Sequence, residues 1–242
     1  IINEIDILIN VEGEDININK KIYFLFNEEE IKLIKDAVNN DDLKNLNNSN
    51  TELYINNNRI LEFQKYLISR IKEQSRIIII DNVLELDAFH EEELDISIWQ
   101  ADEKNNNTTM KFLIKNALRN NPDWIIISET RGSEAYSMIK SGLSGHKIIT
   151  TLHSDSAESN IDRLIHMCKE KYDLDQMLLG KMITDVFDIG IHIDYDITKE
   201  GTKRYICQIV EYIDYSDEGV IVNPIFQLKL QPVKQKDGTY KY

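Results

Sequence analysis

Continuous apolar runs alternate along the middle of the chain with segments whose apolar residues recur at helical spacing. Such a run is typical of a strand that is covered on both faces of a sheet. The runs are RIIIID at 76–81, WIIIS at 124–128 and KIITT at 147–151. The helical spacing predicts helices over 59–73, at about 108–119, from Ser133, and over about 155–167. This alternation predicts right-handed crossovers and a mainly parallel sheet.

The pattern becomes β-rich towards the end of the chain. Segments at 187–195 and 204–215 predict antiparallel edge strands, and ELYI at 52–55 predicts a short strand before the first helix of the alternating region. The predicted fold class is therefore α/β, with a mainly parallel sheet and antiparallel C-terminal strands.

The first fifty residues differ from the rest. Short apolar runs at 5–9 and 22–26 predict strands of a small sheet, and Asn27 followed by three glutamates predicts the start of a helix. The polar segment NNDDLKNLNNSN at 39–50 is the best candidate for a boundary. We therefore predict a reduced N-terminal segment over 1–50 and an α/β domain over 51–242.

The composition and charge of the chain argue against some classes of function. The formal net charge of -14 argues against sequence-independent binding to nucleic acid, because phosphates repel such a surface. Cys168 and Cys207 lack metal-ligand spacing, so we expect reduced, buried thiols in a cytosolic protein. No apolar run reaches membrane-spanning length and no signal peptide is visible. The sequence opens on IINEID rather than methionine, which indicates a fragment or a trimmed chain.

Polar side chains flank the three apolar strands, and we expect adjacent parallel strands to gather them into one cleft. The residues are Asp81, Asn82, Glu85, Glu129, Arg131, His146 and His153. Carboxylates orient Mg²⁺ and water, while arginine and histidine stabilise charge on phosphate oxygens, so the set suits phosphoryl chemistry. Each residue alone is better explained as a solvated strand end or a hydrogen-bonded turn residue. Only their combination, in order, points to function.

Three longer motifs carry a resemblance to a known family. LIKNALRNNPDWIIISETRGSEA is similar to the Walker B segment of the secretion and pilus ATPase superfamily, which comprises the hexameric motors of type II and type IV secretion and of type IV pili. SGLSGHKIITTLHSDSAESNIDRL resembles its histidine box, and RIIIIDNVLEL resembles its aspartate box. The β-rich tail resembles the branch of conjugation-type and Tad pilus motors. The likeness covers roughly residues 50 to 230 and implies a RecA-like fold.

The resemblance assigns roles by position. It implies that Glu129 polarises the attacking water, that Arg131 is the arginine that follows this glutamate, and that Asp81 and Glu85 lie near the terminal phosphate and metal. Glu129 and Asp81 would then hold Mg²⁺ indirectly. The histidine-box residues, which sense nucleotide and link neighbouring subunits, would be His146 and His153. The chain departs from the family in reading Asp81-Asn82 where the aspartate box usually reads Glu-Asp, so the first acid is shorter and the second is lost.

A larger departure is the missing phosphate-binding loop. That loop needs G-x-x-x-x-G-K-[ST], because glycines let backbone N–H groups close around the phosphates while lysine supplies charge. The corresponding place reads ELYINNNRILEFQKYL, and the chain has no glycine between Gly13 and Gly132. Arg59 stands near the position of the family's lysine and is the one cofactor-binding candidate there. Arginine binds phosphate, but it cannot replace the backbone cradle, so a solvated charge at the helix start is the simpler interpretation.

Three hypotheses follow. The favoured one is a degenerate motor subunit with a structural or regulatory role in a hexameric ring of itself or with an active paralogue. The second is a working ATPase that uses ATP and Mg²⁺ through an unconventional phosphate site to power pilus assembly, conjugation or secretion. The third is a non-enzymatic interaction module with no cofactor. The resemblance implies a cytoplasmic location at the periphery of the membrane, an inner-membrane platform protein as partner, and no nucleic acid.

Overall fold

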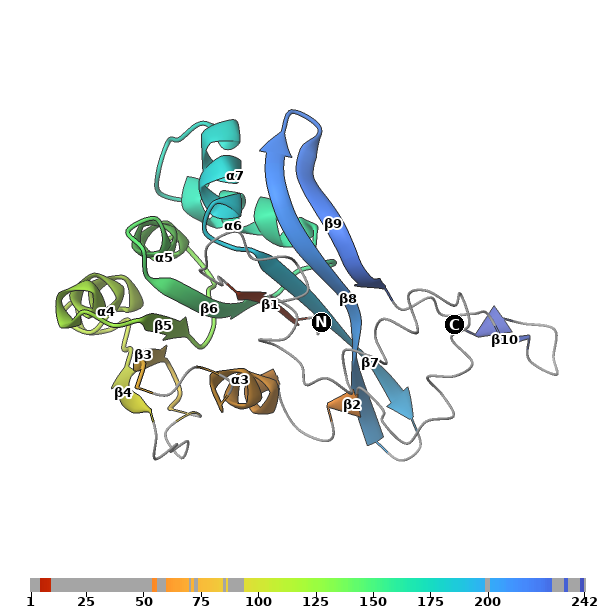
Figure 1. The fold of residues 1–242 in the computed structure, drawn as a ribbon, viewed down its shortest axis with the longest axis horizontal. Coiled ribbons are helices and arrows are strands. Elements are labelled where there is room, and N and C mark those ends of the chain that lie inside the picture. The colour runs from red at the N-terminus through yellow and green to blue at the C-terminus, as the bar shows by residue number, and fades with distance from the viewer. Residues whose placement is uncertain are drawn as a thin grey trace.

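A computed structural model describes residues 5–9, 54–55, 60–69, 71, 74–84, 86, 94–198, 201–227, 233–234 and 240–241. Nine strands form one sheet in the order β2-β8-β7-β1-β6-β5-β3-β4, with β9 paired to β8 (Figure 1). They are β1 (Ile5–Ile9), β2 (Tyr54–Ile55), β3 (Arg76–Asp81), β4 (Asp95–Gln100), β5 (Trp124–Ile127), β6 (Lys147–Leu152), β7 (Ile189–Thr198), β8 (Gly201–Ser216) and β9 (Gly219–Gln227).

Helices pack on both faces of this sheet. They are α3 (Ile60–Ser69), α4 (Met110–Ala117), the 3-10 helix η1 (Leu118–Asn120), α5 (Ala135–Gly142), α6 (Ser159–Lys169) and α7 (Gln176–Thr184). A separate pair of short strands, β10 (Val233–Lys234) and β11 (Tyr240–Lys241), is antiparallel. No helix in the described ranges is long and apolar enough to cross a membrane.

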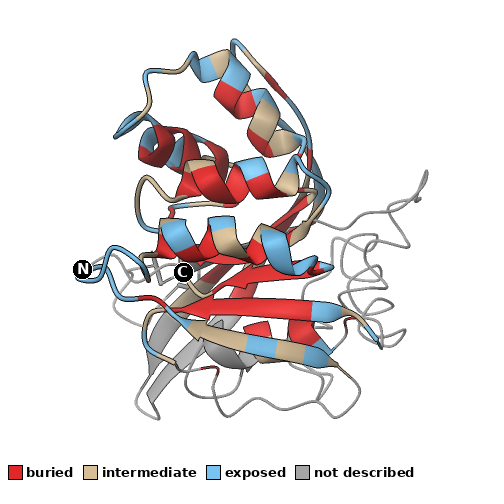
Figure 2. Cartoon of the chain, turned by 90° about the vertical axis from the view of Figure 1, so that its left-hand side faces the viewer, coloured by how far each residue is buried: buried red, intermediate tan, exposed pale blue. Residues whose placement is uncertain are grey.

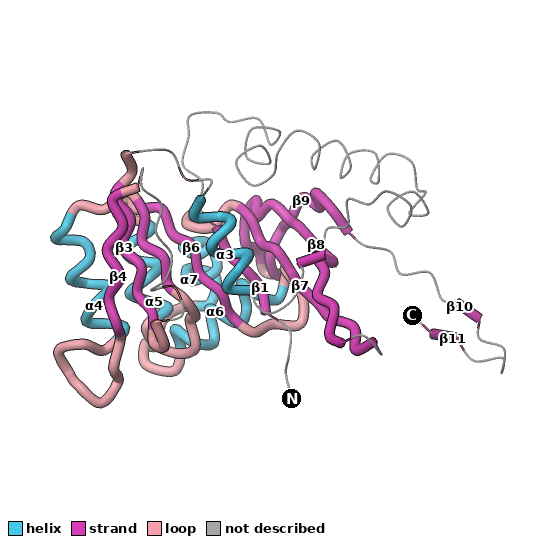
Figure 3. The backbone as a smooth tube through the Cα atoms, turned by 90° about the horizontal axis from the view of Figure 1, so that it is seen from below, coloured by secondary structure: helices cyan, strands magenta, loops and turns pink. Residues whose placement is uncertain are grey.

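The predicted fold class is confirmed. Strands β4, β3, β5 and β6 are parallel neighbours, whereas β7, β8 and β9 form an antiparallel group. Figure 3 shows β3 and β4 beside α4 at one end of the molecule, and β8 and β9 towards the other. The carboxyl ends of β3, β5 and β6 consequently share one edge of the sheet.

Strand β3 shows why the continuous apolar runs become central strands. Ile78 and Ile80 belong to the core beneath α4 to α7, whereas Ile77 and Ile79 belong to the core that contains α3 residues. All four are at most 1% exposed. Successive side chains of a strand point to opposite faces, so a strand covered on both sides needs apolar residues at every position.

The sheet-facing sides of the helices follow the predicted spacing. In α4 the buried residues are Met110, Leu113, Ile114 and Ala117, and the side chain of Thr109 caps the helix by accepting the Phe112 N–H at 3.2 Å. A serine or threonine cap of this kind contributes about 1 kcal/mol. Figure 2 shows the buried residues of the helices grouped into faces. The helix predicted at about 108–119 is confirmed.

Three features differ from the sequence expectations. Strand β1 is a strand as predicted, but it pairs antiparallel with β6 and β7 within the main sheet and not within a small sheet of its own. Strands β7 and β8 are antiparallel as predicted, but each lies between two neighbours, so the expectation of edge strands was wrong. Strand β4 and helix α7 were not predicted.

The proposed boundary at 39–50, the strand at 22–26 and the helix after Asn27 lie outside the described residues. The division into a segment over 1–50 and a domain over 51–242 therefore stays a prediction.

Candidate functional site

The loop that follows β5 is joined to strand β6 by hydrogen bonds. The backbone N–H of Thr130 donates to the Thr151 carbonyl at 2.8 Å, and the Thr151 hydroxyl donates to the Ser128 carbonyl at 2.5 Å. The hydroxyls of Thr130 and Thr150 lie 2.8 Å apart, and both residues are buried. These bonds continue the contact with β6 past the end of β5, and they position the residues on either side of Thr130.

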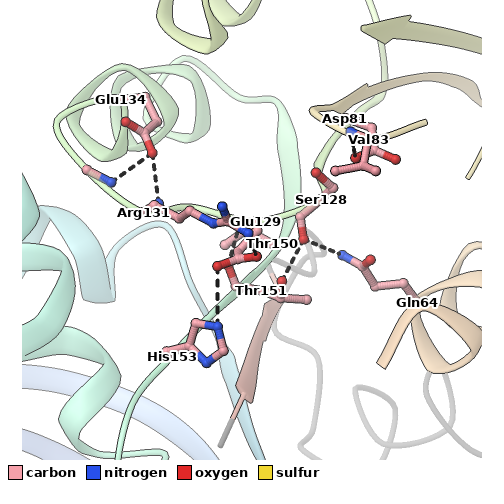
Figure 4. A network of polar contacts seen from close by, with 11 residues as sticks. Gln64, Asp81, Val83, Ser128, Glu129, Arg131, Glu134, Thr150, Thr151 and His153 are labelled. Carbon is pink, nitrogen blue, oxygen red and sulfur yellow. Dashed lines mark hydrogen bonds and ion pairs between the residues drawn. The ribbon is translucent and has the colours of Figure 1, made fainter. Parts of the chain in front are cut away.

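Glu129 lies between a cation and an imidazole at this edge (Figure 4). Its Oε2 accepts from Nη2 of Arg131 at 2.6 Å, and its Oε1 lies 3.4 Å from Nε2 of His153. The Glu129 side chain is 17% exposed, against 66% for Arg131 and 37% for His153. The hydrogen bond to Glu129 raises the pKa of Arg131, so this guanidinium stays charged. The structure thus brings together three of the predicted site residues, and both oxygens of the central carboxylate contact protein groups.

A fourth residue, Glu134, organises this loop and was missed at the sequence level. Its Oε1 accepts the backbone N–H groups of Arg131 and Gly132, each at 2.8 Å. The carboxylate therefore fixes the backbone that carries Arg131, directly before α5 begins. Residues 131–134 read RGSE and lack the Ser or Thr that opens a capping box, so no local sequence signal could have identified this role of Glu134.

Asp81 lies at the end of the neighbouring strand β3 but has a different environment. It is 3% exposed. Its Oδ1 accepts the Val83 N–H at 3.1 Å, and its Oδ2 accepts the Leu86 N–H at 3.3 Å. In the described part of the chain no basic side chain pairs with it. Asp81 thus closes the turn after β3.

Helix α3 also reaches this edge of the sheet. Gln64 is 2% exposed, and its Nε2 donates to the Ser128 carbonyl at 3.4 Å (Figure 4). The backbone end of β5 therefore receives a bond from α3 on one side and from Thr151 on the other. Sequence reasoning did not single out Gln64, because a glutamine on a helix gives no local sign of a buried partner.

His146 does not join the cleft, so its predicted place there was wrong. It precedes β6, whereas His153 follows it, and its Nδ1 lies 3.3 Å from the Ser141 carbonyl and 3.4 Å from the Ser144 hydroxyl. Residues before and after a strand lie at opposite edges of the sheet, here about 20 Å apart at about 3.3 Å per residue. Glu85 and Arg59, the remaining candidates, lie outside the described residues.

The site is a poor fit for Mg²⁺ held by protein groups alone. The residues that the structure describes contain no group of three or more His, Cys, Asp and Glu side chains able to hold a metal. Mg²⁺ in phosphoryl-transfer sites commonly uses one or two carboxylates plus substrate phosphates and water. Glu129 and Asp81 are the predicted carboxylates, yet every oxygen of the two already accepts from or contacts a protein group. A metal would have to share these oxygens with the protein groups that they already contact.

The part of the chain that contains this site is similar in sequence to known proteins. The family described as "Type II/IV secretion system protein" matches residues 64–186. An uncharacterized protein of Bacillus anthracis is 37% identical over 168 residues, which are 65% of this chain and 37% of that protein. The type IV secretion system protein VirB11 of Brucella suis is 30% identical over 152 residues, 60% of this chain and 42% of that protein. The chain thus spans about two fifths of these relatives.

A solved structure shows the same fold. The crystal structure of the VirB11 ATPase from the Brucella suis type IV secretion system, in complex with sulphate, superimposes with a TM-score of 0.56 at 24% identity. The match covers 76% of this chain and 55% of that one. At this identity the likeness supports the architecture alone, and it agrees with the predicted RecA-like sheet.

Proposed function

Because this chain belongs to the type II/IV secretion system protein family, we propose that it is a subunit of a secretion or pilus motor with a degenerate nucleotide site and a structural or regulatory role. The predicted resemblance to the secretion and pilus ATPase superfamily is confirmed by the family match and by the VirB11 relatives. The matched region, 64–186, includes Asp81, Glu129 and His153.

The observation that carries the proposal is the engagement of the two acids. Both oxygens of Asp81 accept backbone N–H groups of their own turn, and both oxygens of Glu129 contact Arg131 or His153. Each carboxylate oxygen accepts up to two hydrogen bonds, so an attacking water would have to share its acceptor with a group of the protein. In this arrangement the acids stabilise the protein's own loops.

The sequence adds an independent reason. No stretch of the chain reads G-x-x-x-x-G-K-[ST]. Such a loop supplies several charge-assisted hydrogen bonds of about 1.5–3 kcal/mol each. The loss of two of them alone weakens binding by roughly 10²- to 10⁴-fold, which moves a micromolar ATP site to about 0.1–10 mM, and the loss of the remaining contacts weakens it further.

A calorimetric titration with Mg-ATP tests the proposal. We expect no saturable heat at ATP concentrations up to about 1 mM, and no rise in melting temperature, because a ligand stabilises by RT ln(1 + [L]/Kd), which is close to zero when Kd far exceeds the ligand concentration. Glu129→Gln serves as the site variant, and Glu218→Gln, which changes an exposed acid in a distant turn, serves as the matched control. Steady ATP turnover that Glu129→Gln abolishes and Glu218→Gln keeps would overturn the degenerate site.

The second candidate is an active ATPase with an unconventional phosphate site. It is favoured by the convergence of Glu129, Arg131 and His153 at the carboxyl edge of adjacent strands, where ligands bind in open α/β sheets. ATP and Mg²⁺ would then be its cofactors. In this candidate the attacking water uses the remaining lone pairs of Glu129, beside its contacts with Arg131 and His153. The same turnover assay decides between the two candidates, since only the active enzyme loses a measurable rate in Glu129→Gln.

We further propose a ring with other copies of the chain or with an active paralogue, at the cytoplasmic face of the membrane and next to a platform protein. The support is the family and the type IV secretion relatives. The assignment to a hexamer and to the Tad pilus branch rests on the sequence resemblance alone. Light scattering of the purified chain, alone and co-expressed with a paralogue that carries the phosphate loop, distinguishes a homomeric ring from a mixed one.

A further inference from the structure

One face of the β8–β9 hairpin, which we call its inner face, is hydrogen-bonded to the start of α6. The Oε1 of Gln208 accepts the Ala157 N–H at 2.9 Å, and its Nε2 donates to Oε1 of Glu158 at 2.7 Å. The Tyr212 hydroxyl donates to the Ala157 carbonyl at 2.5 Å and accepts from Nδ2 of Asn160 at 3.1 Å. Two side chains of β8 thereby hold the turn that leads into α6.

Tyr215 extends this attachment to α7. Its hydroxyl donates to Oδ1 of Asp162 at 3.0 Å and accepts from Nε2 of Gln176 at 2.9 Å. Its ring lies against Gly180, where an added Cβ would come within 2.2 Å of ring carbons. Burial raises the pKa of the Tyr215 hydroxyl, which keeps the group protonated as a donor. The inner face of the hairpin is therefore rigidly held.

The outer face of the same hairpin is uncovered. Tyr212 pairs with Val222 and Tyr215 with Val220, and all four pack against the core beneath α7. The register shifts between Tyr212 and Asp214, so Ile213 is an extra residue on the outer side. Ile213 is 55% exposed and Ile221 is 45% exposed. Asp214 is also exposed and pairs with Ile221. We call these three residues the outer hairpin face.

Lys203 and Arg204 lie near the start of β8, but from residue 205 onwards the charge of the hairpin is of one sign. Residues 205–227 contain no lysine or arginine and four acids, Glu211, Asp214, Asp217 and Glu218. Asp217 and Glu218 form the exposed tip of the hairpin, which extends past α7 in Figure 1. Two exposed isoleucines on an acidic, rigid ribbon are complementary to a segment that is both basic and apolar.

The chain contains such a segment directly after β9. Residues 228–242 read LKLQPVKQKDGTYKY, with four lysines against one aspartate, a net charge of +3. Leu228, Leu230 and Val233 provide apolar side chains between the lysines. The two described strands of this segment, β10 and β11, pair with each other and not with the nine-stranded sheet. No described strand of the nine-stranded sheet pairs with this segment.

We propose that the outer hairpin face binds the lysine-rich segment 228–242 of a second copy of this chain. The contact is head-to-tail, because the surface on one copy differs from the segment that the other copy supplies, and such contacts close into rings or extend as filaments. Each copy contributes one hairpin and one segment. The inference goes beyond the proposed function, since it assigns residues to the junction between copies and does not depend on nucleotide.

A synthetic peptide of residues 228–242 tests the recognition step. The receptor is the full chain with Lys229, Lys234, Lys236 and Lys241 changed to glutamine, so that its own segment does not compete. We expect saturable binding by fluorescence anisotropy, weakened at least ~10-fold in Ile213→Ser/Ile221→Ser. Raising salt from about 50 to about 500 mM should also weaken it.

Leu143→Ser is the matched control, because Leu143 is 43% exposed on a different element. It should leave the affinity for the peptide unchanged, and the same peptide with its four lysines changed to glutamine should bind at least ~10-fold more weakly. Equal weakening by Leu143→Ser and by the hairpin variant, or no saturable binding, overturns the proposal. Thermal melts establish that each variant is folded.

A mixing experiment shows whether the segment acts between copies. One partner carries the four Lys→Gln changes with an intact hairpin, and the other carries Ile213→Ser/Ile221→Ser with an intact segment. Neither partner can form the junction alone, whereas the mixture has one working pair. We expect light scattering to detect a 1:1 complex in the mixture only. Absence of that complex overturns an intermolecular junction. Both assays omit ATP, so their failure leaves the proposed function standing, and ATP turnover leaves this inference standing.

Discussion

The turn after β3 and the turn after β5 carry acids at neighbouring positions of one sheet edge, yet the two acids have different partners. Asp81 is 3% exposed and accepts two backbone N–H groups of the residues that follow it. Glu129 is 17% exposed and contacts the side chains of Arg131 and His153. The turn after β3, here the first turn, is held by backbone N–H groups that donate to Asp81. The turn after β5, the second turn, is held by contacts of Glu129 with side chains from the loops that follow β5 and β6.

Acids at similar positions after neighbouring strands therefore have different chemistry in this protein. A buried carboxylate that caps a turn is costly to disturb, since an unsatisfied N–H would remain inside the protein. A partly exposed carboxylate beside an exposed arginine contributes little to stability and is easier to rearrange. The turn after β3 is therefore expected to matter for folding, and the turn after β5 for charge-dependent interactions.

The largest expected effect comes from removing the acceptor at Asp81. In Asp81→Asn the side chain keeps its volume, but its amide N–H₂ cannot accept the Leu86 N–H, so we expect a loss of about 2–3 kcal/mol in unfolding free energy. Glu129→Gln should cost less than about 1 kcal/mol, because its partners are partly exposed. Urea unfolding of the two variants measures the difference. Equal losses would remove the distinction between the two turns.

A smaller effect is expected at Glu134, which orders the second turn. Glu134→Ala removes the acceptor for two backbone N–H groups, so we expect a loss of about 1–2 kcal/mol. Both N–H groups donate to the same oxygen, and Glu134→Gln keeps an oxygen there, so it should cost about 0.5 kcal/mol or less. Thermal melts of both variants report the loss. A glutamine variant as unstable as the alanine variant would show that charge, and not the acceptor, holds this turn.

The thiol of Cys168, in the core beneath α4 to α7, makes the unfolding free energy depend on pH. Burial, with a smaller effect of nearby Glu134, raises the pKa of its thiol from 9.0 to about 12. As pH rises, the Cys168 thiol ionises in the unfolded chain before it ionises in the folded protein. The contribution of the protonated thiol to the unfolding free energy is therefore complete below pH 9 and is lost as pH rises towards 12. Between pH 8 and 9.5 this amounts to roughly 0.8 kcal/mol.

Comparison of Cys168→Ala with the unchanged protein isolates that contribution. The alkaline loss of unfolding free energy should be smaller by this amount in the variant, measured by urea unfolding at the two pH values. The native thiol should also react slowly with an alkylating reagent at pH 8.5, because the thiol is buried and its pKa is raised. Rapid alkylation of Cys168 in the folded protein would contradict its burial beneath the second turn.

The smallest effect is expected at Arg131. Its side chain is 66% exposed, so Arg131→Met should change the unfolding free energy by about 0.5 kcal/mol or less despite the short 2.6 Å contact. The raised pKa of Arg131 keeps it cationic across the pH range of the folded protein, so its contact with Glu129 is sensitive to salt and not to the titration of Arg131. A destabilisation above about 2 kcal/mol would place the second turn in the same structural class as the first.

Local patterns predicted most of the parallel half of the fold. The apolar runs of β3, β5 and β6 and the helical spacing of α4 reflect burial that each segment requires wherever it packs. Strand β4 was missed because its apolar signal is short. Ile96 and Ile98 alternate with more polar neighbours, but both are only partly buried.

Helix α7 was missed for a different reason. The interior glycine of this helix, Gly180, weakens the local helical signal, since glycine costs about 1 kcal/mol in a helix interior. In the structure this glycine gives the Tyr215 ring room to pack on α7, where a Cβ would approach to 2.2 Å. Asp175 also caps the helix by accepting the Leu178 N–H at 2.9 Å. The contact with a strand 35 residues later outweighs the local preference.

Residue type, order and local period were sufficient to predict the family resemblance and the α/β class. They also predicted a polar cleft of seven residues, of which the structure brings Glu129, Arg131 and His153 together. Only the tertiary structure decided that β1 lies inside the main sheet, that His146 lies at the opposite edge from His153, and that Asp81 is buried against its own turn. The physical reason is that a side chain's partners are set by packing between distant segments, which residue type and spacing along one segment do not record.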